Sequence, residues 1–175
     1  MKIIYLSLIL QLFYFQVYGQ ISQENNDTIK IIQYHNIQTN KRHESISFEY
    51  HRSLAVTKKK LEITFDTRGI TAKTQTINEE KLEYKTDAII KYDSLNFAEL
   101  VEIFNNCLKI KAEDNDINFL DGASNCISYV SESIRKVICI TSPNYETEKR
   151  GLSDFLELRS KIISICQQTD EILKR

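Results

Sequence analysis

In three successive stretches of this sequence, apolar residues recur at every second position. They are Ile46, Phe48 and Tyr50, then Leu61, Ile63 and Phe65, and then Leu82, Tyr84 and Ala88, with Thr86 at the position between the last two. Side chains in a β-strand point alternately to opposite faces of the sheet, so this spacing predicts strands with one buried face. Turn residues at Asp66–Gly69 join the second stretch to a further strand at Ile70–Ile77. We therefore predict an antiparallel meander with one wet face, in which Tyr50 and Tyr84 lie on apolar faces.

The spacing of apolar residues changes after Asn96. From there they recur three and four residues apart, which places them on one side of an α-helix. These residues are Phe97, Leu100, Val101, Phe104 and Leu108. Asn96 is a favourable N-cap residue, and Glu99 stands three positions later, where its side chain can bond back to the cap. A helix is therefore expected to begin directly after Asn96.

The second half of the chain predicts a hairpin and a closing helix. Ser124–Val130 and Ile134–Thr141 have the composition of two strands joined by a polar loop. The last helix is expected to begin at about Glu146 or Ser153 and to run to Gln168, although Arg159 interrupts its apolar face. Together the elements predict an α+β fold with an antiparallel sheet of about five or six strands and two helices on one face. Their order is meander, helix, hairpin, helix.

The first nineteen residues have the three parts of a secretory signal peptide. Lys2 is the basic part, Ile3–Val17 the apolar part and Gly19 the small residue before the cleavage position. The apolar part is shorter than the roughly 20 residues that span a bilayer. We expect residues 1–19 to be removed, which leaves no membrane anchor and makes the protein secreted or periplasmic. Residues 20–44 are then a polar N-terminal arm with at most one strand, and residues 45–175 are a single α+β domain.

All four cysteines lie in the second half of the chain, at Cys107, Cys126, Cys139 and Cys166. An even number of cysteines in an exported protein permits disulfides, and the absence of a C-x-x-C pair argues against zinc. If the hairpin loop has two residues, Cys126 and Cys139 stand directly opposite one another, where they can form a bridge. Pairing Cys107 with Cys166 would join the two helices. The alternative is four buried free thiols.

The charge balance does not favour a nucleic-acid partner. The chain has 23 basic and 24 acidic residues, whereas a nucleic-acid-binding protein normally shows a basic excess or stripe. The one dense basic run, Lys58–Lys60, is expected at a solvated strand entrance. The expected partner is another protein, and the oligomeric state stays open.

An acidic loop resembles the beginning of a calcium site without completing it. Asp114, Asp116 and Asn118 have the spacing of the first calcium ligands. Phe119 and Asn125 then stand where an EF-hand needs a glycine and a bidentate acid. We therefore interpret this segment as a solvated loop.

Three histidines, His35, His43 and His51, recur every eight residues. Three imidazoles can hold zinc or serve a nucleophile, but each lies in a polar stretch without the surrounding pattern of such a site. No G-x-S-x-G nucleophile motif is present in the sequence. We therefore predict no catalytic, cofactor-binding or metal-binding residues.

About a third of the chain resembles small exported bacterial proteins of unknown function. The resemblance rests on Phe119–Gly122, a hairpin that ends at Ser142–Pro143, and a closing helix with Phe155 and Ile162–Ile163. It implies an exported location and this architecture, and it implies no catalytic residue.

These observations favour a non-enzymatic binding or interaction protein of the periplasm or exterior, such as an inhibitor or an immunity protein. Two alternatives stay open. One is a divergent secreted hydrolase, which requires a pocket where a histidine meets an acid and a hydroxyl. The other is a structural component of the envelope that docks through the arm at residues 20–44.

Overall fold

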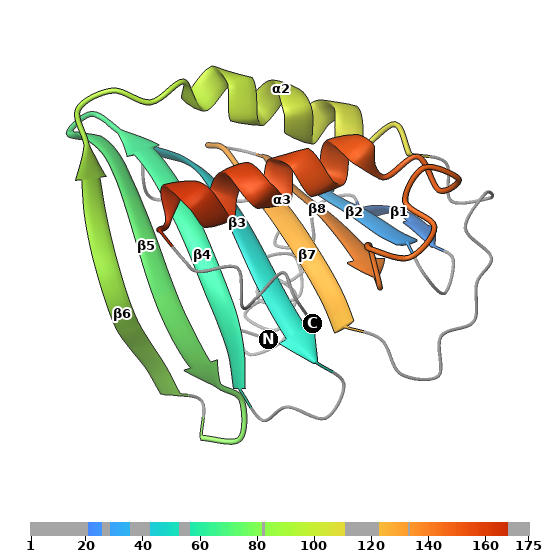
Figure 1. The fold of residues 1–175 in the computed structure, drawn as a ribbon. Coiled ribbons are helices and arrows are strands. Elements are labelled where there is room, and N and C mark those ends of the chain that lie inside the picture. Colours follow the sequence, from blue (N-terminus) through green and yellow to red (C-terminus); the bar gives the residue numbers. More distant parts are fainter. Residues whose placement is uncertain are drawn as a thin grey trace, which may run out of the picture.

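The structure is a computed structural model that describes residues 21–25, 29–35, 43–52, 57–81, 83–110, 123–132 and 134–167. These residues form eight strands and two helices (Figure 1). The elements are β1 (Ile21–Asn25), β2 (Ile29–His35), β3 (His43–Arg52), β4 (Thr57–Asp66), β5 (Gly69–Asn78), β6 (Glu83–Tyr92), α2 (Phe97–Cys107), β7 (Ala123–Val130), β8 (Ile134–Thr141) and α3 (Ser153–Ile165).

All eight strands belong to one sheet, in the order β1-β2-β8-β7-β3-β4-β5-β6, and every neighbouring pair is antiparallel. The β7–β8 hairpin is inserted between β2 and β3, which are consecutive in the sequence. The predicted α+β class with an antiparallel sheet and two helices is confirmed. The predicted number of about five or six strands is wrong.

The uncounted strands come from the segment predicted as a polar arm. β2 pairs along its whole length with β8, and β1 pairs with β2. Ile29 of β2 is buried and lies opposite the buried Ile140 of β8. A few apolar residues suffice here because β8 supplies an edge with free backbone groups, so the ladder itself stabilises the added strand. The sequence alone does not show this edge, because the edge depends on where the hairpin lies in the sheet.

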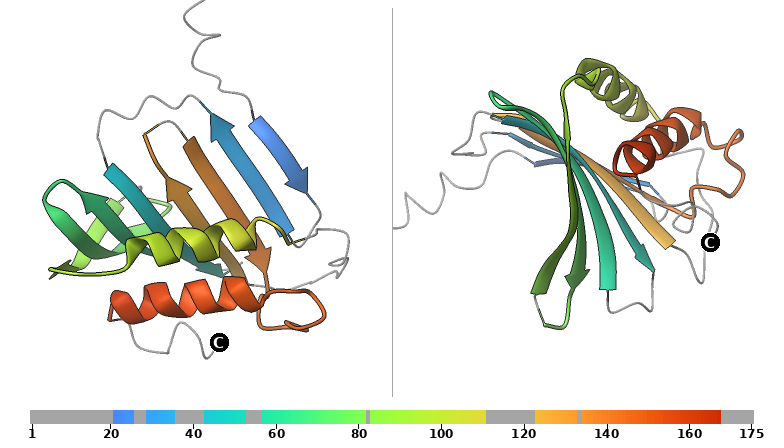
Figure 2. Two further views of the ribbon diagram at one scale, coloured as in Figure 1. Left: turned by 90° about the horizontal axis from the view of Figure 1, so that it is seen from above. Right: turned by 60° about the vertical axis from the view of Figure 1, so that its left-hand side comes forward.

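The alternating residues of the central strands form one buried face, which we call the inner face. Residues directly opposite each other in a ladder share a face, as Ile46 and Ile63 do, and likewise Phe48 and Leu61. All four side chains are buried in the main core. Both helices lie on this same side of the sheet (Figure 2). We call the opposite side of the sheet the outer face.

Helix α2 begins where the sequence predicts. The Asn96 side chain accepts a hydrogen bond from the backbone N–H of Glu99 at 3.3 Å, which satisfies one of the free donors of the first turn. Its buried residues are Phe97, Leu100, Phe104 and Cys107. They are the apolar stripe that the spacing predicts, and they face the sheet and α3.

Helix α3 begins at Ser153, the later of the two predicted positions. The chain turns just before it at Gly151, whose φ of +64° is a left-handed conformation that glycine adopts without steric cost. Its buried residues are Phe155, Leu158, Arg159, Ile162 and Ile163. No helix within the described residues is both long and apolar enough to cross a membrane.

The two helices run antiparallel to each other across the sheet (Figure 1). Lys161 of α3 contacts Glu99 of α2, with 2.7 Å between Nζ and Oε1. At the end of α3 the hydroxyl group of Tyr92 donates a hydrogen bond to the carbonyl group of Ile165. The first contact joins the two helices, and the second joins α3 to β6.

A β-bulge in β6 corrects the prediction for Tyr84. Ala88 pairs with Thr74, but Thr86 pairs with Gln75, so Asp87 is an extra residue in the ladder. One extra residue exchanges the faces of all side chains beyond it. Tyr84 therefore lies on the outer face, where it is 67% exposed, although the alternation predicts an apolar face.

Candidate functional site

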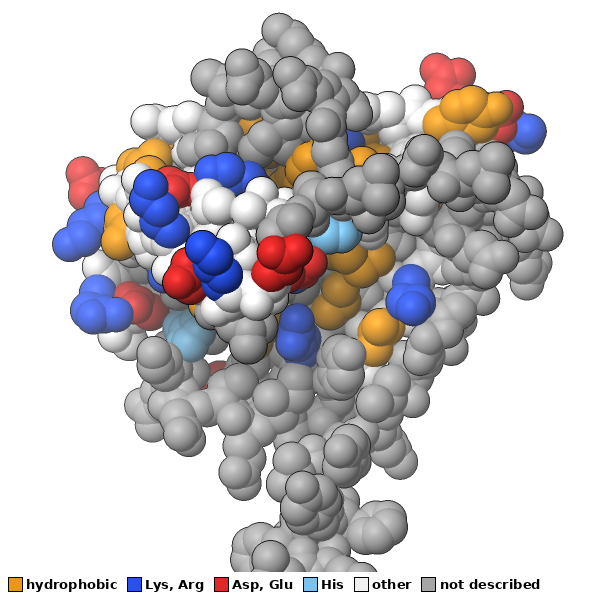
Figure 3. All heavy atoms as spheres, turned by 90° about the horizontal axis from the view of Figure 1, so that it is seen from below, with side chains coloured by type: hydrophobic (Ala, Val, Ile, Leu, Met, Phe, Trp, Pro, Cys, Tyr) orange, Lys and Arg blue, Asp and Glu red, His pale blue; other side chains and the backbone are white. Residues whose placement is uncertain are grey.

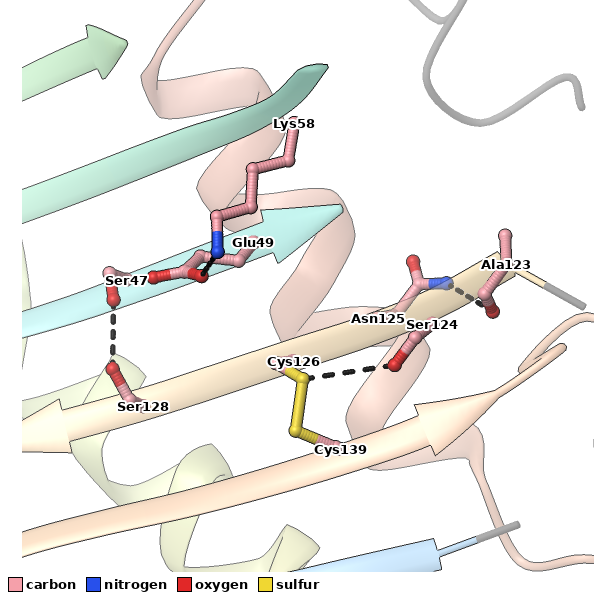
Figure 4. The surroundings of a disulfide bond; sticks show 9 residues. All are labelled: Ser47, Glu49, Lys58, Ala123, Ser124, Asn125, Cys126, Ser128 and Cys139. Atoms are coloured by element: carbon pink, nitrogen blue, oxygen red, sulfur yellow. Dashed lines mark hydrogen bonds and ion pairs between the residues drawn. A yellow bond between two sulfur atoms is a disulfide. The ribbon is translucent and has the colours of Figure 1, made fainter. Parts of the chain in front are cut away.

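A disulfide joins Cys126 and Cys139 on the outer face (Figure 4). The two residues are direct partners in the β7–β8 ladder, and their Cα atoms are 4.0 Å apart. Beside the bridge, the hydroxyl groups of Ser47 and Ser128 are hydrogen-bonded at 2.8 Å. The predicted cross-strand pair is thus present. Such bridges persist in oxidising compartments outside the cytoplasm, so this one is consistent with the predicted export.

The predicted bridge between Cys107 and Cys166 is not formed, and both are buried thiols outside any disulfide. Each residue lies at the C-terminal end of its helix. Because the helices are antiparallel, these ends lie at opposite ends of the helix pair (Figure 1). Burial raises the pKa of each thiol to about 12, so both are protonated and unreactive at neutral pH.

The histidines of β3 cannot share a metal ion. His43 and His51 stand at opposite ends of a ten-residue strand, which separates them by about 27 Å at the usual rise per residue. His51 lies 3.8 Å from Glu79, measured from Nδ1 to Oε2. Within the described residues, no group of three or more His, Cys, Asp or Glu side chains is arranged to hold a metal ion. The predicted solvated loop at 113–121 and the predicted signal peptide at 1–19 lie outside the described residues.

An open recess of about 500 Å³ lies at the end of the sheet where β3 begins. Its lining comes from the start of β3, the β4–β5 turn and the β7–β8 turn. The lining residues are His43, Glu44, Phe65, Asp66, Thr67, Ser131 and Glu132. The recess thus brings a histidine, carboxylates and hydroxyl groups together, which is the composition that the hydrolase alternative requires.

The acids of this recess are already engaged by other groups. Asp66 accepts hydrogen bonds from the backbone N–H and from Nη2 of Arg68, at 2.7 and 2.9 Å, and these bonds hold the pKa of Asp66 below its usual value. The hydroxyl group of Tyr129 donates to Glu44 Oε2 at 3.0 Å. Burial, followed by this carboxylate, raises the pKa of Tyr129 to about 12.

His43 is the ladder partner of Asp66, yet the Asp66 carboxylate bonds to Arg68 instead. Among the described residues no hydrogen bond joins His43 to a hydroxyl group, so a nucleophile–base pair is not assembled there. The recess therefore contains the residue types of a hydrolase, but its described residues do not form the hydrogen bond between histidine and hydroxyl group that a hydrolase uses.

Strand β6 combines an edge position in the sheet with exposed large hydrophobic side chains. It is the last strand of the sheet, so one edge of its ten-residue backbone has no neighbouring strand among the described residues. Ile89 is the ladder partner of Lys73 and lies on the outer face with Tyr84. Ile89 is 60% exposed. The sequence shows the strand but not its place at the edge, and the bulge at Asp87 has no local sequence signal.

The lysine run of β4 is neutralised by carboxylates. Lys58 lies 3.0 Å from Glu79, and the Lys59 ammonium contacts Asp87 at 2.7 Å. Lys60 contacts Glu62 at 3.1 Å. Seen from below, basic and acidic side chains are interspersed over the β4–β6 side of the molecule (Figure 3). The run is therefore no free basic patch of the kind that binds a polyanion.

No protein-family model, curated protein or solved structure matches this chain. The functional argument therefore rests on the surfaces and side chains described above.

Proposed function

We propose that this protein is an exported, non-enzymatic binding protein that recognises another protein through the free edge of β6. The observation that supports this proposal most directly is the pair Tyr84 and Ile89, two large side chains that are more than half exposed on one face of an edge strand. Unpaired strand edges bind extended segments by adding a strand, and flanking side chains then provide specificity.

Strand β6 also carries features that limit uncontrolled pairing. Lys85 and Lys91 are exposed on the strand, and the bulge at Asp87 interrupts its regular ladder. Charges and bulges are how natural proteins prevent edge strands from aggregating. An edge that keeps two exposed apolar side chains within this protection is suited to one specific partner. We infer that the partner adds an extended segment beside β6 and covers Tyr84 and Ile89.

The proposal can be tested with the purified protein and a partner captured from the envelope or the medium of its host. The Tyr84→Ala and Ile89→Ala variants should each weaken the affinity for that partner at least about tenfold, as for typical hot-spot side chains. Tyr145→Ala is the matched control, because Tyr145 is also half exposed but lies in the loop before α3.

Hydrogen exchange supplies the second measurement. Backbone amides at the free edge of β6 should be slowed when the partner binds, because a strand addition pairs them. A partner that binds the two edge variants as tightly as the unaltered protein, or leaves β6 exchange unchanged, would contradict the proposal.

A further inference from the structure

Arg159 of α3 is a buried cation that the rest of the described structure does not neutralise. Its side chain is only 7% exposed. Nη2 donates to the side-chain oxygen of Asn144 at 2.8 Å, and the buried Nε has no hydrogen-bond partner among the described residues. No carboxylate of the described residues lies within ion-pair distance of it. Buried charges are normally paired, so this arrangement requires an explanation.

The other buried arginine shows what a structural role looks like in this fold. Arg150 is 2% exposed, and its guanidinium donates to the backbone carbonyl groups of Thr141, Ser142 and Tyr145. It thereby closes the loop that connects β8 to α3. Within the part of the chain that the structure describes, Arg159 bonds to one exposed side chain of the same loop, Asn144, and to no backbone group.

The electrostatic surroundings of Arg159 point to an anion. Burial lowers its pKa, and Tyr50 of β3 opposes that effect. Lys59, the ladder partner of Tyr50, is already paired with Asp87. Among the described residues, Arg159 is therefore a buried positive charge without a carboxylate partner.

One charge and the shape of the guanidinium select the ligand class. Nε and Nη2 lie on the same edge of the guanidinium, where parallel N–H groups bind two oxygens of one anion. Nη2 has two N–H groups, of which Asn144 uses one. A monoanionic carboxylate matches a single positive charge, whereas a doubly charged phosphate usually requires more cations or a helix N-terminus.

We propose that Arg159 anchors a carboxylate-binding site between α3 and the loop that precedes it, with Asn144 at its solvent-facing entrance. The site is separate from the β6 edge, so it goes beyond the proposed partner-binding function. The carboxylate comes either from a small free acid or from the C-terminus of a peptide, and both present the same two oxygens.

The first experiment measures thermal unfolding of the full chain with sodium acetate, against sodium sulfate, phosphate and chloride at equal ionic strength. Acetate at ten times its Kd should raise the Tm by about 3–6 °C, which follows from ligand linkage for a domain of this size. Arg159→Met should lose this shift. Arg68→Met should keep it, because Arg68 is an exposed arginine that contacts only Asp66 among the described residues.

A second measurement does not depend on the folding of any variant. The N–H resonance of Arg159 Nε, observed by NMR in the unaltered protein, should move downfield as acetate is added and should saturate with the same Kd. Arg159→Lys keeps the charge but lacks the paired N–H edge, so its Kd for acetate should rise about tenfold.

Peptide probes distinguish the two sources of the carboxylate. Tighter binding of an acetylated tripeptide acid than of acetate, and loss of binding for the tripeptide amide, would identify a C-terminus. Equal binding of acetate and the peptide acid would identify a small free acid. The proposal is overturned if no carboxylate changes the Tm or the Nε resonance, as expected if water satisfies Nε. It is also overturned if sulfate or phosphate acts in place of acetate, or if Arg159→Met responds as the unaltered protein does.

Discussion

The two buried arginines show that the hydrogen-bond partners of a side chain decide its role. Arg150 donates to three backbone carbonyl groups and stabilises a loop. Arg159 donates one hydrogen bond to an exposed asparagine side chain. At the same scale, Cys126 and Cys139 are bridged, while Cys107 and Cys166 are protonated thiols in the core. Residue type alone does not separate these cases.

Removing the disulfide should destabilise the protein without abolishing the fold. The bridge closes a loop with a sequence separation of 13, for which the chain-entropy model gives about 3 kcal/mol. The double variant Cys126→Ser, Cys139→Ser should lose that amount in urea unfolding. A reducing agent should lower the stability of the unaltered protein equally and leave the double variant unchanged. Loss of stability in the double variant on reduction would show that a different pair of cysteines is bridged.

At the scale of elements, α2 depends on its cap and β6 on its bulge. Asn96 fixes the start of α2 through its bond to Glu99. In β6 the extra residue, Asp87, accepts hydrogen bonds from Lys59 at 2.7 Å and from Thr76 at 2.6 Å. The bulge thus turns a charged side chain toward β5 and β4 and leaves Tyr84 on the outer face.

Asn96→Ala should lower the free energy of unfolding by about 1 kcal/mol, the usual cost of losing an N-cap. Asn105→Ala is the matched control, because Asn105 is exposed within the same helix. The control should be neutral or slightly stabilising, since alanine is the better helix former. Equal urea midpoints for the two variants would mean that the cap bond is not formed in solution.

Asp87→Asn should remove part of the acid sensitivity of the β5–β6 hairpin. Lys59, followed by Thr76, lowers the pKa of Asp87 below its ordinary value of 3.8. A lowered folded-state pKa gives stability that is present above the unfolded-state pKa and is lost as the pH falls through the folded-state pKa. Unfolding at pH 7 should therefore show a loss of less than about 1 kcal/mol in the variant, and this loss should disappear as the pH falls through the lowered pKa of Asp87. Asp93→Asn, which removes the same charge at an exposed position after β6, is the matched control.

At the scale of the whole molecule, one core joins both helices to the sheet. Phe104 of α2 and Phe155 of α3 belong to the same buried cluster as Phe48 and Leu61 of the central strands. Neither helix has a core of its own. The sheet, in turn, would expose its inner face if the helices left it.

The helices and the sheet should therefore unfold together. Far-UV circular dichroism and tyrosine fluorescence should give one coincident transition. Phe104→Ala should lower the stability by about 3–5 kcal/mol, and it should move both probes by the same amount. A helix signal that melts before the fluorescence signal would contradict a shared core.

The sequence by itself determined the features that depend on near neighbours. The alternation around Ile46 and Leu61 predicts strands, Asn96 predicts the start of α2, and a short loop predicts the pairing of Cys126 with Cys139. Each of these follows from residues within one element or one hairpin, where backbone geometry alone sets the distance between side chains.

Only the tertiary structure decided the rest. It placed β2 beside β8, turned Tyr84 outward at a bulge, and set Cys107 and Cys166 at opposite ends of an antiparallel helix pair. It also buried Arg159, which the sequence shows only as an interruption of an apolar face. These outcomes depend on contacts between segments far apart in the chain, and the spacing of residues within a segment carries no information about which distant surface will cover it.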